Sequence, residues 1–258
     1  MTVCPSEFVT LADRLADAAR PVIRKYFRTP VAVDGKADSS PVTIADREVE
    51  AAMRAIIAET YPQHGILGEE HGRQNTDAEW VWVLDPIDGT MAFITGKPSF
   101  GTLIALCHRG TPVLGIIDQA ILGERWLGGA GHPTTLNGTP ARVRACDDLS
   151  KAYAYTTGPE FFGPDTLPGW NRIAKRVKQP RYGCDCYAYA LLSSGHVDLV
   201  VEAGLKPYDY CALVPVIENA GGTVTDWAGD KVTIASDGRI CAAGDARLHA
   251  QALEVLAG

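Results

Sequence analysis

The stretch VWVLDPIDGT, residues 81–90, decides how this chain folds. Its four large apolar residues predict a buried strand. We expect that strand to stop at Asp85 and the chain to turn at Pro86, so that Asp85 and Asp88 stand three residues apart at the end of a buried element. Proline and Asp-Gly are also common turn residues, so the segment alone does not distinguish a functional carboxylate pair from a plain turn.

Outward from this strand, the first half of the chain predicts helices over a series of strands. An apolar stripe predicts a helix over residues 6–27, and a second helix starts at a Thr43 N-cap with Asp46 three residues on and ends at Tyr61. Short apolar runs bounded by turn residues predict strands at 65–70, 80–84, 102–108, 112–118 and 124–131.

In the second half, predicted strands and helices alternate from Lys151 to a last helix near 245–256. The chain contains no internal repeat and no long linker. The order of elements predicts a layered α/β fold with mixed sheets and two intimately packed lobes. We place the N-terminal α+β lobe at residues 1–145 and the C-terminal α/β lobe at residues 146–258.

The composition narrows the possible partners. A formal net charge of −7 argues against a nucleic acid or an anionic membrane surface, although a small phosphorylated substrate is compatible if metal ions supply positive charge. Seven cysteines with no C-x-x-C pair favour reduced thiols over a disulfide framework. The first residues lack a signal-peptide pattern, and no apolar run reaches the ~20 residues that span a bilayer, so we expect a cytoplasmic location.

Acidic residues stand at the ends of several predicted elements. They are Asp46, Glu69 with Glu70, Asp85 with Asp88, and Asp209. Each has a plain alternative role, as a helix cap or as a solvated loop residue. If they meet in space, their charges repel unless a cation neutralises them, and ligands that are all oxygen select Mg²⁺ or Mn²⁺.

Gly89 and Thr90 begin a predicted helix directly after the two aspartates. The free N–H groups and the positive dipole end of a helix favour an anion, and a metal ion beside them suits a phosphate group. The segment therefore predicts a site that handles a phosphorylated molecule.

Three motifs in order, Gly68-Glu69-Glu70, DPIDGT at 85–90, and Tyr208-Asp209 followed by Gly221-Gly222, resemble the inositol monophosphatase family of Mg²⁺-dependent, lithium-sensitive phosphatases. The resemblance covers nearly the whole chain and implies an α-β-α-β-α fold, a homodimer, and two or three Mg²⁺ ions per subunit. The metal ligands that it implies are Glu69, Asp85, the Ile87 carbonyl, Asp88 and Asp209. By the same resemblance, Thr90 paired with Asp46, together with Glu69, is expected to orient the attacking water.

Two longer segments, at 93–126 and 184–210, are more similar to the histidinol-phosphate phosphatase branch than to the inositol-specific branch. The resemblance implies hydrolysis of L-histidinol phosphate in histidine biosynthesis. The alternatives are inositol 1-phosphate or another small sugar phosphate, and a catalytically silent homologue that binds metal or phosphate. Met91 departs from the cationic or hydroxyl residue expected after DPIDGT, which puts a charge-assisted role at that position in doubt.

Substrate contacts are expected on both sides of the metal ligands. The phosphate side would use Asp88, Gly89, Thr90 and Asp209. Histidinol phosphate also carries an ammonium group and an imidazole, so its pocket should present acids beyond those that bind metal. The candidates are Asp185, by resemblance, and Glu202, at the end of a predicted strand seven residues before Asp209, although either could be a helix cap or a strand-end acid.

Overall fold

The computed structural model describes residues 3–30, 33–35 and 41–258. The chain begins with helix α1 (Ser6–Tyr26), the hairpin of β1 (Val33–Gly35) and β2 (Pro41–Thr43), and helix α2 (Ile44–Thr60). The start of α2 is as expected: the Thr43 side chain accepts from the Ala45 N–H, and Asp46 completes a capping box by accepting from the Thr43 N–H at 2.8 Å.

An eight-stranded sheet follows, with the strand order β10-β9-β8-β7-β6-β5-β3-β4. Its strands are β3 (Gly65–Gly68), β4 (Gly72–Gln74), β5 (Trp80–Asp88), β6 (Gly101–His108), β7 (Thr111–Gln119), β8 (Glu124–Gly129), β9 (His132–Leu136) and β10 (Thr139–Pro140). The single-turn helix α3 (Thr90–Ile94) lies between β5 and β6.

The second half builds a five-stranded sheet with the order β12-β11-β13-β15-β14. Its strands are β11 (Tyr153–Thr156), β12 (Gln179–Tyr182), β13 (Leu199–Glu202), β14 (Thr223–Asp226) and β15 (Ile240–Ala243). The helices of this half are α4 (Leu167–Ala174), α5 (Cys186–Ser193), α6 (Pro207–Tyr210), α7 (Leu213–Glu218) and α8 (Ala246–Ala257).

Strand β5 shows why the first sheet is covered on both faces. Successive side chains of a strand point to opposite faces. Trp82 and Leu84 pack in the cluster formed with α1 and α2, whereas Val81 and Val83 pack in the cluster formed with α5 and α7. Both faces of this strand are apolar, so the sheet needs helices on each side.

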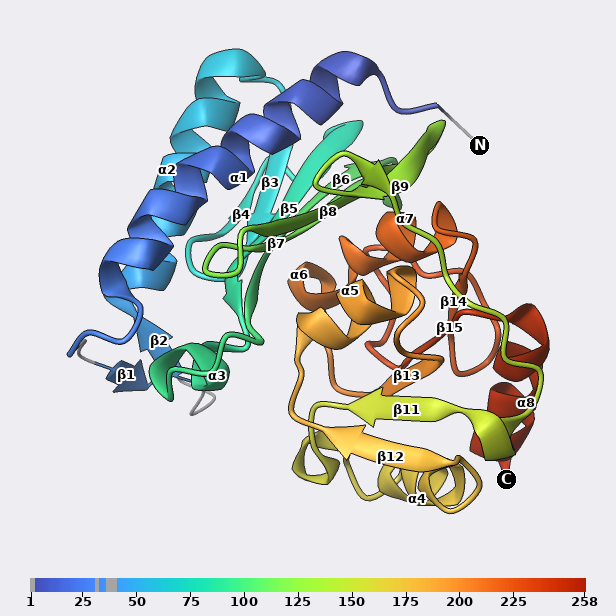
Figure 1. Cartoon of the computed structure of the whole chain (residues 1–258). Coiled ribbons are helices and arrows are strands. Elements are labelled where there is room, and N and C mark those ends of the chain that lie inside the picture. The colour runs from blue at the N-terminus through green and yellow to red at the C-terminus, as the bar shows by residue number, and fades with distance from the viewer. Residues whose placement is uncertain (1–2, 31–32, 36–40) are drawn as a thin grey trace.

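The second sheet repeats this arrangement. Val200 of β13 faces the cluster that contains α5 and α7, while Leu199 and Val201 face the cluster that contains α4 and α8. The layers therefore run from α1 and α2 through the first sheet, the α5–α7 layer and the second sheet to α4 and α8 (Figure 1). This order confirms the expected α-β-α-β-α fold.

The expected end of β5 was wrong. The strand does not stop at Asp85 but runs to Asp88, with an irregular register between Asp85 and Asp88. Pro86 has no N–H to donate to the neighbouring strand. Its carbonyl accepts a hydrogen bond from the Thr102 hydroxyl at 2.8 Å. Strand pairing resumes between Asp88 and Gly101. The result is a bulge that carries both aspartates.

Among the strands that were not expected from the sequence are β4 and β12. Both lie at sheet edges and are largely exposed. Edge strands of this kind carry polar residues and lack an apolar alternation.

In the part of the chain that the structure describes, no helix is both long and apolar enough to span a membrane.

Candidate metal centre and active site

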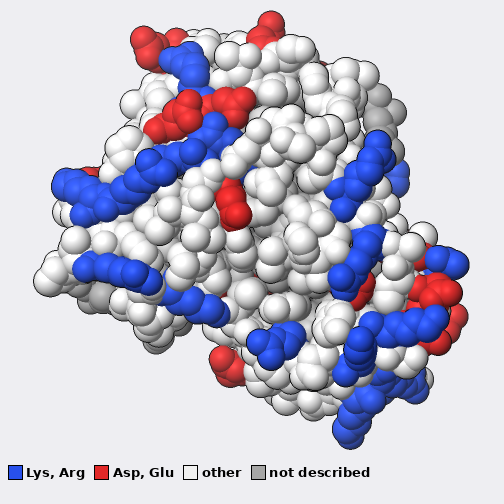
Figure 2. Space-filling view, viewed as in Figure 1, with Lys and Arg blue, Asp and Glu red and all other residues white. Residues whose placement is uncertain are grey.

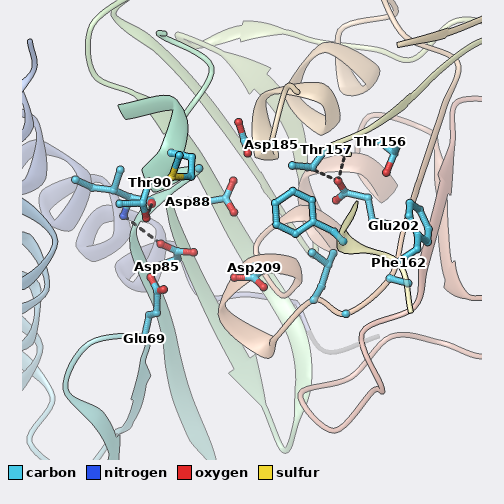
Figure 3. A pocket seen from close by; sticks show the side chains of 17 residues that line it. Glu69, Asp85, Asp88, Thr90, Thr156, Thr157, Phe162, Asp185, Glu202 and Asp209 are labelled. Atoms are coloured by element: carbon cyan, nitrogen blue, oxygen red, sulfur yellow. Dashed lines mark hydrogen bonds between the residues drawn. The ribbon is translucent and has the colours of Figure 1, made fainter. Parts of the chain in front are cut away.

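Three aspartates from different parts of the chain meet at the bulge of β5. Asp85, Asp88 and Asp209 each offer a carboxylate oxygen, and these oxygens all lie within 4.8 Å of one another. Asp209 comes from α6, where its Oδ2 accepts the Lys206 N–H at 2.7 Å. Figure 3 shows Glu69, from the turn after β3, pointing toward Asp85 from the other side. The structure thus brings the four expected acidic ligands together.

Burial and mutual repulsion disfavour the ionised form of this cluster. The pKa of Asp85 is raised well above its ordinary range by burial and then by the charges of Glu69, Asp88 and Asp209. The pKa of Asp88 is also raised well above its ordinary range, by burial and then by the charges of Asp185 and Asp209. Burial raises the pKa of Asp209 to about 7. A divalent cation would relieve this repulsion, and a donor set of carboxylate oxygens fits Mg²⁺ or Mn²⁺ rather than zinc.

A pH dependence of stability follows from the raised pKa of Asp209. Between its ordinary value of 3.8 and about 7, the folded metal-free protein holds a proton that the unfolded chain releases. The unfolded state therefore binds fewer protons, and this group's contribution to stability falls as pH rises through that window. Burial lowers the pKa of His64 and of His249, so the contribution of these two groups to stability rises with pH instead.

The comparison that isolates Asp209 uses Asp209→Asn, which keeps both histidines. In EDTA, the wild type is expected to lose roughly 1–3 kcal/mol relative to Asp209→Asn between pH 4 and 7. Urea unfolding of both proteins across this range measures the difference. If the wild type instead gains stability relative to the variant as pH rises, the Asp209 carboxylate is not the repelled group described above.

Thr90 and Asp46 lie beside the cluster but do not hydrogen-bond each other. The Thr90 hydroxyl donates to the Ile87 carbonyl at 3.2 Å. Asp46 Oδ2 accepts from the Thr43 N–H and hydroxyl, at 2.8 and 2.6 Å. Asp46 Oδ1 is buried and, among the described residues, has no hydrogen-bond partner. Because the capping box uses only Oδ2, Oδ1 remains available to accept a proton donor, and the expected role of the pair stays a prediction.

Gly89 and Asp185 are in close contact at one side of the site. Gly89 has a left-handed backbone (φ 82°, ψ 42°), and a Cβ at this position would lie 2.8 Å from Asp185 Cγ. Asp185 itself has φ 49° and ψ −145°, which is a strained conformation for a non-glycine residue. It occupies the N-cap position of α5 but makes no side-chain cap bond there. Instead, Asp88 Oδ2 accepts the Cys186 N–H at 2.7 Å.

The side chain of Asp185 is only weakly held. The Ser99 hydroxyl donates to its Oδ2 at 3.4 Å. Burial raises the pKa of Asp185, while the charge of Lys97 and the Ser99 hydrogen bond oppose this shift. The plain alternative, a helix cap, is therefore not what this side chain does.

Glu202 lies across the cavity from the metal-ligand cluster and is firmly held (Figure 3). Its Oε1 accepts from the Thr157 N–H at 2.8 Å and from the Thr157 hydroxyl, and its Oε2 accepts from the Tyr189 hydroxyl at 2.8 Å. Burial raises its pKa, and these hydrogen bonds lower it. Glu202 is thus more than a strand-end acid, because three hydrogen bonds, from Thr157 after β11 and from Tyr189 of α5, fix its orientation.

The metal-ligand cluster, Thr90, Asp185 and Glu202 line one cavity of about 250 Å³, whereas Asp46 is buried outside its lining. Its lining holds six carboxylates: Glu69, Asp85, Asp88, Asp185, Glu202 and Asp209. No Lys, Arg or His occurs among the described residues that line it. On the face of the molecule in Figure 2, Lys and Arg lie in separate groups mixed with Asp and Glu, with no continuous basic track. A phosphate in this cavity would therefore need its positive charge from bound metal.

Sequence reasoning missed part of this lining. Thr156 is the last residue of β11 and Thr157 follows it, and a strand end was the one signal that could have indicated them. Phe161 and Phe162 line the cavity from the segment between β11 and α4, and no sequence pattern marked them.

Known proteins resemble this chain over most of its length. The family model described as the inositol monophosphatase family matches residues 5–257. A bifunctional phosphatase IMPL2, chloroplastic, of Arabidopsis thaliana is 54% identical over 258 residues, which cover 96% of this chain and 75% of that protein. A histidinol-phosphatase of Chlorobaculum parvum is 33% identical, with 90% of each chain covered. A solved structure of an inositol monophosphatase from Zymomonas mobilis superposes with a TM-score of 0.91 at 48% identity, covering 98% of both chains.

Proposed function

Because the chain belongs to the inositol monophosphatase family, and is a phosphatase of that family, we propose that it hydrolyses L-histidinol phosphate to L-histidinol and phosphate with Mg²⁺. The observation that carries the choice of substrate is the acidic cavity, which has six carboxylates and no described cationic side chain. Four of the acids belong to the metal-ligand cluster. Asp185 and Glu202 remain for a substrate body with positive charge, and histidinol supplies an ammonium group. The name of the Chlorobaculum parvum relative supports the same choice.

In this proposal, Glu69, Asp85, the Ile87 carbonyl, Asp88 and Asp209 hold two or three Mg²⁺ ions. When bound, Mg²⁺ supplies Lewis-acid neutralisation of the phosphate oxygens and lowers the pKa of the attacking water. Thr90 and Asp46 orient this water: the Thr90 hydroxyl already lies at the Ile87 carbonyl, and Asp46 Oδ1 is available as an acceptor.

The phosphate is held beside the start of α3. The first N–H groups of a helix have no partner within it, so those of Gly89 and Thr90 can donate to phosphate oxygens. Helix α3 has a single turn, so its dipole adds little, and the metal ions provide most of the charge. Water attacks phosphorus in line as the bond to the histidinol oxygen breaks; the water gives up a proton, the leaving oxygen gains one, and no covalent intermediate with the protein is needed.

The remaining parts of the proposal concern the context of the enzyme. We place it in histidine biosynthesis as a cytoplasmic homodimer with a small phosphorylated substrate and no nucleic-acid or membrane partner. The second candidate substrate is inositol 1-phosphate, which the Zymomonas mobilis structure favours through its name.

The test of the substrate uses the two acids that are not assigned to metal. Asp185→Asn and Glu202→Gln remove charge with little change of shape. A charge-assisted hydrogen bond contributes about 1.5–3 kcal/mol, so each variant is expected to lower kcat/KM for histidinol phosphate by roughly 10- to 150-fold. Hydrolysis of p-nitrophenyl phosphate, which has no ammonium group, should stay nearly unchanged.

Tyr189→Phe is the matched control for Glu202, because it removes the hydroxyl bonded to Oε2 and keeps the charge. It should cost far less on histidinol phosphate than Glu202→Gln does. Equal losses on both substrates in Asp185→Asn and Glu202→Gln would mean that these acids support the metal centre, and the case for a cationic substrate would fail.

A further inference from the structure

Glu50, on α2, is a fully buried acid outside the cavity, and its carboxylate lies under the turn between β3 and β4. Its Oε2 accepts the Glu70 N–H at 2.7 Å, and its Oε1 accepts the His71 N–H at 3.1 Å. The fit is close, because a Cβ on Gly68 would lie 2.0 Å from Glu50 Oε1. The glycine of the Gly68-Glu69-Glu70 motif is therefore the residue that admits this carboxylate.

Arg54, one helical turn further along α2, completes the contact. Its Nε lies 2.7 Å from Glu50 Oε1, and its Nη2 donates to the Gly72 carbonyl. Arg54 thus neutralises the buried charge of Glu50 and also binds the end of the turn, at Gly72. A buried carboxylate with this many donors is well satisfied and strongly oriented.

Glu69, the metal-ligand candidate, stands between these fixed points. Its own N–H donates to the Leu84 carbonyl of β5 at 3.2 Å, directly before Asp85. The next two N–H groups, those of Glu70 and His71, donate to Glu50. The backbone at Glu69 is therefore tied to β5 on one side and to α2 on the other.

We propose that Glu50 is a positioning residue for the metal centre: by holding the β3–β4 turn, it sets the orientation of Glu69 toward Asp85, Asp88 and Asp209, so that losing its carboxylate weakens divalent-metal binding. This inference rests on the proposed metal centre. Asp46 lies four residues before Glu50 on α2, so one helix would place both Asp46 and Glu69.

Glu50→Gln tests the inference. A carboxamide presents N–H donors on one side, so it cannot accept from Glu70, His71 and Arg54 together. Mg²⁺ is titrated calorimetrically into metal-stripped protein without substrate, and thermal unfolding is recorded in EDTA. Partners that orient metal ligands commonly contribute 10- to 100-fold in affinity, and we expect the Mg²⁺ dissociation constant to rise by about tenfold or more.

Asp198→Asn is the matched control. Asp198 is also a buried carboxylate, 2% exposed, and it accepts from Arg144 Nε at 2.6 Å and from the Tyr153 N–H at 2.8 Å in the second sheet. Its substitution should lower the unfolding temperature and leave the Mg²⁺ dissociation constant within about twofold of the wild-type value. A variant that is only less stable would behave like this control.

The outcomes separate the claims. Lower stability with unchanged Mg²⁺ affinity in Glu50→Gln would make Glu50 purely structural and overturn the inference. If Glu50→Gln does not fold, Arg54→Lys keeps the charge beside Glu50 but loses the forked geometry that reaches Gly72, and it should weaken Mg²⁺ binding by about two- to fivefold; unchanged affinity there also overturns the inference. A wild-type protein that binds no Mg²⁺ would overturn the metal centre itself.

Discussion

Asp88→Asn is expected to lower kcat/KM by roughly 10³-fold or more and to weaken Mg²⁺ binding severely. Asp88 lies within the three-aspartate cluster, so it is placed to share any ion held there. Asparagine keeps the shape and can still accept the Cys186 N–H, which Asp88 Oδ2 accepts at 2.7 Å. The substitution therefore removes a charge without removing the fold.

Although Asp88→Asn should lower activity and Mg²⁺ affinity, we expect it to keep or raise the stability of the metal-free protein. Burial and the charges of Asp185 and Asp209 raise the pKa of Asp88, which means that its ionised form is repelled in the absence of a cation. In EDTA near neutral pH, Asp88→Asn should unfold at the same temperature as the wild type or at a higher one. Calorimetry and steady-state kinetics at several Mg²⁺ concentrations measure both effects. Near-wild-type turnover in limiting Mg²⁺ would remove Asp88 from the ligand set.

Thr90→Ala is the substitution with the second large expected effect, a decrease of kcat. The Thr90 hydroxyl lies in the cavity beside the Ile87 carbonyl, where we place the attacking water. An interaction with the nucleophile acts in the transition state, so kcat should fall by about 10²-fold while KM changes by no more than about twofold. Steady-state kinetics with histidinol phosphate at saturating Mg²⁺ measure both constants.

Thr90→Ser is the control, because it keeps the hydroxyl and removes only a methyl group. It should retain most of the wild-type kcat. A loss confined to KM in Thr90→Ala, or an equal loss of kcat in Thr90→Ser, would move the hydroxyl out of the catalytic role.

The sequence indicated the layers of the fold because the pattern of large apolar residues is local. Residues 81–84 are apolar on both faces of one strand, and the structure covers both faces with helices. The end of that strand could not be read in the same way. Its bulge depends on the Thr102 hydroxyl and on pairing with Gly101, and both partners belong to another strand.

The same distinction between local sequence pattern and tertiary contact applies to the candidate site. Motif order indicated Glu69, Asp85, Asp88 and Asp209, and the structure brings them together. What the sequence could not give is the state of each side chain. The three hydrogen bonds that fix Glu202 come from Thr157 and Tyr189, 45 and 13 residues away in the chain, and the Asp185 side chain packs against Gly89, which is far from it in the sequence. Such contacts are set by tertiary structure, so no local pattern records them.

The most direct test of the proposed activity is phosphate release by the purified protein from L-histidinol phosphate, inositol 1-phosphate and a sugar phosphate at saturating Mg²⁺. The acidic cavity predicts a kcat/KM for L-histidinol phosphate that is about tenfold or more above the values for both neutral-bodied phosphates, and EDTA should abolish every activity. A higher kcat/KM on inositol 1-phosphate would contradict the proposed substrate, and turnover that survives EDTA would contradict the metal centre.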